Sequence, residues 1–143
     1  MMKYILCLCF AVVISPAVFA ADQLDAKAIE GSWTPIMAEL AGQPMPDAVL
    51  KTISLKLADG KYEAMSGGHP DYGTYSLDAA SLPKGMTVTG TNGPNNGKTF
   101  PCIYELKGDT LRICYDLSGA KQPSEFKTVA GTKLYLVTYG RSK

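Results

Sequence analysis

Gly31-Ser32-Trp33 opens a region in which short apolar and polar segments alternate with turns up to residue 140. Glycine lets the chain turn tightly into a first strand, because it has no side chain to clash. Tryptophan is large enough for a single ring to close the end of a narrow β-barrel. The stretch therefore predicts a small barrel that is closed by a residue of its own first strand.

The rest of the chain shows the period of two that is typical of strands. One example is residues 53–57, where Ile and Leu alternate with Ser and Lys before the turn signal Asp59-Gly60. Glycine and proline recur throughout, which argues against a helical fold. About eight strands with short links predict an all-β, up-and-down antiparallel barrel, preceded by a short helix or turn over residues 22–30. Leu134 and Leu136 are expected to face the interior, and residues 67–71 to form a mobile loop at the rim.

Cys102 and Cys114 flank a predicted hairpin that turns at Gly108-Asp109. A two-residue loop places the cysteines on opposite faces of the hairpin. It also gives well-matched cross-strand pairs, namely Leu106 with Leu111, Glu105 with Arg112 and Tyr104 with Ile113. A three-residue loop would set the two cysteines opposite each other. A Cys102–Cys114 disulfide and two buried free thiols therefore both remain open.

Residues 1–20 have the three parts of a secretory signal peptide: a basic start at Lys3, an apolar run over residues 5–14, and a break at Ser15-Pro16 before Val18-Phe19-Ala20. We expect cleavage after Ala20, which leaves one domain over residues 21–143 and no membrane anchor. The formal charge of +1 then falls to zero, because Lys3 leaves with the signal. A neutral chain with scattered lysines predicts no nucleic-acid partner. The expected location is the periplasm or the extracellular medium.

Gly31 and Trp33, together with Arg141 after the last expected strand, resemble the lipocalin pattern. In that pattern a basic side chain packs across the tryptophan, a favourable cation–π contact. A broader resemblance covers nearly all of residues 21–143 and includes Gly73-Thr74-Tyr75, Asn92-Gly93-Pro94, Ile103-Tyr104-Glu105-Leu106 and Pro123-Ser124-Glu125-Phe126. As a set these motifs are similar to an uncharacterised lipocalin-like domain family expanded in Planctomycetes. Gln122 and Cys102 depart from its pattern. The resemblance implies an exported lipocalin-like barrel and carries no established activity.

No group of residues specifies a reaction. His69 is the one histidine of the chain, which removes the usual catalytic triads and histidine-rich metal sites. Residues 92–99 are similar to a phosphate-binding loop, but Asn92 replaces its first glycine and a strand follows where a helix is needed. We therefore expect a protein that is not an enzyme and uses no cofactor or metal.

Two binding functions remain, and the amount of free volume inside the barrel distinguishes between them. The first is binding of a small apolar or amphipathic ligand in a cavity near the rim, with Tyr62, His69 and Tyr72 as candidate contacts. The number of large side chains expected inside predicts that this cavity is small at most. The alternative is a protein-binding or inhibitory module whose rim loops, residues 42–48, 67–72 and 92–97, contact an exported protein partner.

Overall fold

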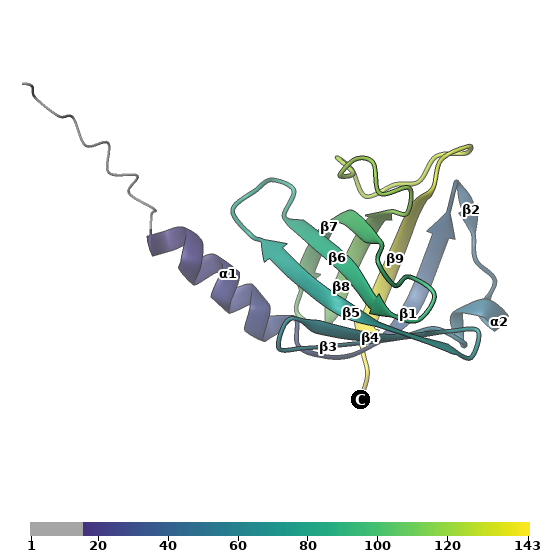
Figure 1. Ribbon diagram of the computed structural model, residues 1–143, viewed down its shortest axis with the longest axis horizontal. Helices are drawn as coiled ribbons and strands as arrows, with labels where there is room; N and C mark the ends of the chain where they lie inside the picture. The colour runs from purple at the N-terminus through teal and green to yellow at the C-terminus, as the bar shows by residue number, and fades with distance from the viewer. Residues whose placement is uncertain (1–15) are drawn as a thin grey trace, which may run out of the picture.

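Two helices and nine strands make up residues 16–143, the part of the chain that the computed structural model describes (Figure 1). The helices are α1 (Pro16–Ala28) and α2 (Asp47–Leu50). The strands are β1 (Gly31–Leu40), β2 (Gln43–Pro44), β3 (Ser54–Ala58), β4 (Lys61–Ser66), β5 (His69–Asp78), β6 (Gly85–Asn92), β7 (Thr99–Lys107), β8 (Thr110–Asp116) and β9 (Leu134–Arg141). Most of the expected signal peptide lies outside the described residues, and α1 runs across the expected cleavage position after Ala20.

Eight of the strands form a closed antiparallel barrel. From β3 to β9, each strand pairs with the next strand along the chain, and β1 pairs with both β3 and β9 to close the ring. The short β2 extends the ladder at the end of β1. This arrangement confirms the expected all-β, up-and-down barrel with a short N-terminal helix.

The β7–β8 hairpin has the expected two-residue turn. Leu106 pairs with Leu111 and Glu105 with Arg112, whose guanidinium lies 3.1 Å from the carboxylate. Gly108 has a positive φ of 56°, which favours glycine at the first turn position. Successive side chains of a strand point to alternate faces, so every second residue faces the barrel interior.

Residues 67–71 do not form a mobile loop, so that expectation is wrong. Gly67 and Gly68 have φ angles of 58° and 82°, and these two residues alone make the turn between β4 and β5. Ser66 therefore pairs directly with His69, and β5 begins at His69. Two glycines in succession can form a tighter turn than the sequence led us to expect.

The inward face of β9 also differs from the expectation. Val137 and Tyr139 are buried in the core, whereas Leu134 and Leu136 fall on the other face of the strand. The register with β8 sets this choice, because Val137 pairs with the buried Ile113. A shift of one residue exchanges the two faces of a strand.

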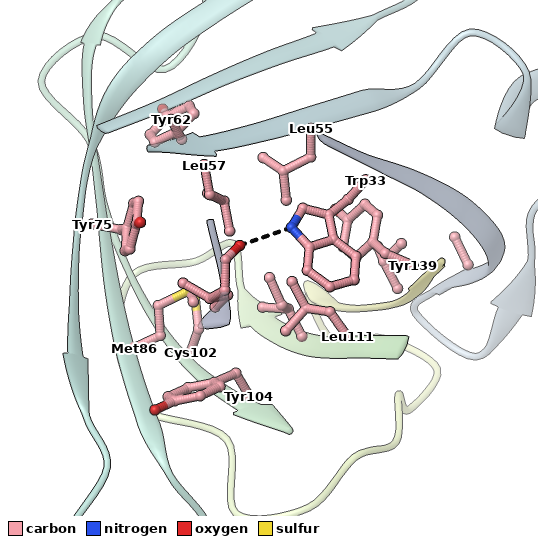
Figure 2. Packing of buried hydrophobic residues seen from close by; sticks show 14 of the residues in the cluster. Trp33, Leu55, Leu57, Tyr62, Tyr75, Met86, Cys102, Tyr104, Leu111 and Tyr139 are labelled. Carbon is pink, nitrogen blue, oxygen red and sulfur yellow. Dashed lines mark hydrogen bonds between the residues drawn. The ribbon is translucent and has the colours of Figure 1, made fainter. Parts of the chain in front are cut away.

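Trp33 closes one end of the barrel. Figure 2 shows its ring among Leu55, Leu111 and Tyr139, and its indole N–H donates to the carbonyl oxygen of Ile29 at 2.9 Å. Trp33 and Ile29 have no exposed surface. This end of the barrel is therefore filled by side chains and capped by the segment that leads from α1 into β1.

Arg141 covers the same end. Its guanidinium carbon lies 4.4 Å from the centroid of the Trp33 ring, and its N–H groups donate to the carbonyl oxygens of Ala28 and Glu30 at 2.8 Å. Gly31 leaves room for this side chain, because a Cβ there would lie 2.8 Å from the guanidinium. Its φ of 135° is also one that other residues rarely adopt.

Two carboxylates of α1 attach the helix to the barrel. Asp22 accepts the backbone N–H of Ala79 at 2.8 Å, and Asp25 accepts hydrogen bonds from Lys84 at 2.8 Å and the Tyr104 hydroxyl at 2.6 Å. Burial raises the pKa of Asp25, but these hydrogen bonds and the Lys84 charge outweigh burial and hold the pKa below its usual range. Both carboxylates lie beyond the expected cleavage position, so cleavage would leave them in the mature chain.

Replacing Trp33 with Phe should lower the free energy of unfolding by about 2–4 kcal/mol. The Ile29 carbonyl loses its donor, and the smaller ring leaves a cavity. Urea unfolding followed by far-UV circular dichroism measures the change, with the exposed Tyr72→Phe as the control. Equal stability of Trp33→Phe and the wild type would contradict the closing role of Trp33.

Replacing Asp25 with Asn should reduce the loss of stability at acid pH. The pKa of Asp25 is lower in the folded than in the unfolded chain, so its ionised form stabilises the fold above about pH 4 and this contribution is lost as the pH falls through the folded-state value. Urea unfolding at a series of pH values measures this dependence. Glu63→Gln, which neutralises an exposed carboxylate on β4, is the matched control, and an unchanged pH dependence for Asp25→Asn would refute the assignment.

Candidate functional site

A cavity of about 560 Å³ lies inside the barrel and opens at the end away from Trp33. Its volume is within the range of roughly 300–1,000 Å³ that is typical of small-molecule sites. The apolar part of its wall includes inward-facing residues of four strands: Leu55 and Leu57 of β3, Met86 and Val88 of β6, Phe100 of β7 and Ile113 of β8. The expectation of at most a small cavity is therefore wrong.

Small side chains at the open end help to explain this volume. Ala64 and Ser66 follow Tyr62 on the inward face of β4, and both line the cavity. Gly73, which pairs with Tyr62, leaves room for the Tyr62 ring, because a Cβ there would lie 2.4 Å from that ring. The sequence-based count of large residues missed this difference between the closed and open halves.

Three tyrosines place hydroxyl groups in the apolar wall. The rings of Tyr115 and Tyr135 stack with centroids 5.5 Å apart, and the Tyr115 and Tyr139 hydroxyl oxygens lie 3.2 Å from each other. Burial raises the pKa of all three phenols, that of Tyr135 to about 12. They are therefore neutral near pH 7 and offer both hydrogen-bond donors and acceptors.

A buried carboxylate lies at the mouth. Asp71 is 9% exposed and accepts hydrogen bonds from the Tyr62 hydroxyl at 3.0 Å, from the Asn95 side-chain amide at 2.8 Å and from the Asn95 backbone N–H at 3.3 Å. Burial, and then the hydrogen bond to Asp71, raise the pKa of Tyr62, which remains a donor. These bonds fasten the loop after β6 to β5. Gly93 allows this close approach, because a Cβ there would lie 2.7 Å from the Pro70 carbonyl oxygen.

Basic side chains also lie at the mouth. Lys98, just before β7, and Lys133, just before β9, line the cavity together with His69 at the start of β5. Both lysines are exposed, and neither forms an ion pair with another residue of the described chain. The mouth thus combines one hydrogen-bonded carboxylate with two unpaired ammonium groups.

Tyr62 and His69 line the cavity as expected, but Tyr72 does not. Tyr72 is 37% exposed and pairs with Glu63 on the outer face of β4 and β5. Alternation could have shown this, because Gly73 and Tyr75 face inward and the residue before Gly73 must face outward. The same alternation would have placed Asp71 inside.

Comparisons with protein-family models, curated proteins and solved structures gave no match to this chain.

Two further observations concern the described residues alone. Over residues 16–143, no three histidine, cysteine, aspartate or glutamate side chains gather in a way that could hold a metal ion. No helix in this part of the chain is long and apolar enough to cross a membrane.

Cys102 and Cys114 are free thiols on opposite faces of the hairpin. Cys102 belongs to the interior cluster and pairs in register with Tyr115. Cys114 pairs with Ile103, and its thiol donates to the Lys127 carbonyl oxygen in the segment after β8, at 3.7 Å. Neither thiol has exposed surface, and burial raises the pKa of each.

Neither cysteine should react with iodoacetamide in the folded protein, because the reactive thiolate is scarce and the sulfur is covered. Both should be fully alkylated in urea without a reducing agent. Peptide mass mapping of Cys102 and Cys114 measures the two reactions. A disulfide-linked peptide from the unreduced sample would overturn the assignment of free thiols.

Proposed function

We propose that this protein is a non-enzymatic binding protein that holds a small amphipathic ligand inside the barrel. The observation that carries the proposal is the cavity of about 560 Å³, whose wall is apolar below and polar at the mouth. Burial of a ligand's apolar part against this wall supplies affinity, at roughly 25 cal/mol for each Å² removed from water. The tyrosine hydroxyls and the mouth residues supply orientation.

The lipocalin resemblance of Gly31, Trp33 and Arg141 favours the same proposal, as does the signal-like sequence of residues 1–20. We therefore propose export to the periplasm or medium and membership in the lipocalin-like family named above. The protein would meet its ligand outside the cytoplasm and shield the ligand's apolar part from water.

The rim-loop alternative has less support. The most exposed large apolar side chains lie elsewhere, with Ile36 and Met37 on β1, Leu24 on α1 and Leu82 between β5 and β6. A protein-binding surface on the rim loops would be expected to gather such side chains there. The interior, in contrast, offers an apolar surface that a ligand can cover.

Replacing Ala64 with Trp should abolish ligand binding by filling the open half of the cavity. Native mass spectrometry of the protein purified from the organism that makes it should show a stoichiometric small adduct on the wild type and none on Ala64→Trp. The matched control is Glu63→Trp, which adds the same ring on the outer face of the same strand.

The control should keep the adduct, and far-UV circular dichroism should show that both variants retain the barrel. An unliganded mass for the wild type, a co-purifying protein in place of a small molecule, or an adduct that persists on Ala64→Trp would each contradict the proposal.

A further inference from the structure

The charged groups at the mouth differ in whether they have partners within the protein. Asp71 accepts three hydrogen bonds, and Tyr62 and Asn95 supply all of them. A buried carboxylate needs such donors, so this group is already satisfied without a ligand. Lys98 and Lys133 line the same mouth and form no ion pair within residues 16–143.

Each of these lysines directly precedes a strand that carries an inward-facing aromatic residue near its start. Tyr135 is the next inward-facing residue after Lys133, and Phe100 is the next after Lys98. Two residues of extended backbone span about 7 Å, so the Cα atom of each lysine lies about that much nearer the opening than the Cα atom of its aromatic neighbour. The wall therefore changes with depth from cationic to aromatic to aliphatic, where Leu57 lies.

We infer that the ligand is a single-chain amphiphile with an anionic head group, such as a carboxylate. The head lies between Lys98 and Lys133, and the chain extends past Tyr135 and Phe100 toward the aliphatic wall. A cationic head would meet two ammonium groups and a carboxylate that already accepts three hydrogen bonds. A neutral head would leave both ammonium groups without a partner. This inference rests on the proposed function, because it requires the cavity to be the binding site.

Three ten-carbon probes that differ only in the head group test the inference: decanoate, 1-decanol and decyltrimethylammonium. Each is titrated by calorimetry, below the concentration at which it forms micelles, into the protein freed of co-purifying lipid. Two lysine contacts at a partly exposed mouth should make decanoate bind about tenfold more tightly than 1-decanol. Decyltrimethylammonium should bind more weakly than 1-decanol.

The double variant Lys98→Gln/Lys133→Gln should lose this tenfold preference and keep the wild-type affinity for 1-decanol. The matched control is Lys56→Gln/Lys61→Gln, which removes the same charge from the outer face of β3 and β4 and should bind all three probes as the wild type does. The control separates a local contact from a change in net charge.

The outcomes distinguish this inference from the proposed function. Three results would overturn the anionic head group and leave the binding cavity in place. They are equal affinity for decanoate and 1-decanol, tighter binding of decyltrimethylammonium, and an equal loss of decanoate affinity in the two double variants. If none of the three probes binds to the wild type, so that the wild type behaves like Ala64→Trp, both the anionic head group and the proposed binding function are overturned.

Discussion

The hydrogen bond from the Trp33 indole to the Ile29 carbonyl oxygen joins the first strand to the segment that leads into it. Both groups are fully buried, where an unpaired donor or acceptor would be costly. Arg141, at the end of the last strand, covers the ring and binds the carbonyl oxygens on either side of Ile29. The two ends of the described barrel chain thus meet at one aromatic side chain, and only the other end of the barrel is left open.

Closure at one end also decides where free volume lies. Large side chains such as Trp33, Leu111 and Tyr104 fill the closed half, whereas Ala64 and Ser66 face inward near the opening. A barrel of eight strands is close to the limit at which side chains alone fill the interior, so a few small residues are enough to create a cavity. The cavity volume therefore depends on the order of large and small residues along the inward faces more than on their total number.

Burial determines which charged groups of the open half need a partner within the protein. Asp71 is buried, must be paired, and is used to hold the loop after β6 against β5. Lys98 and Lys133 reach water, which solvates an ammonium group without a protein partner. The carboxylate is therefore part of the fold, while the two lysines keep their charges available at the mouth.

The sequence by itself determined the all-β class, the antiparallel order of the strands and the register of the β7–β8 hairpin. These depend on alternation and on turn residues such as Gly108-Asp109, which act between neighbouring residues. Only the tertiary structure decided which face of β9 points inward, that His69 belongs to a strand, and how much space the interior contains. Those features depend on pairing between strands far apart in the chain and on how neighbouring side chains share one volume, and neither is encoded in any single stretch of residues.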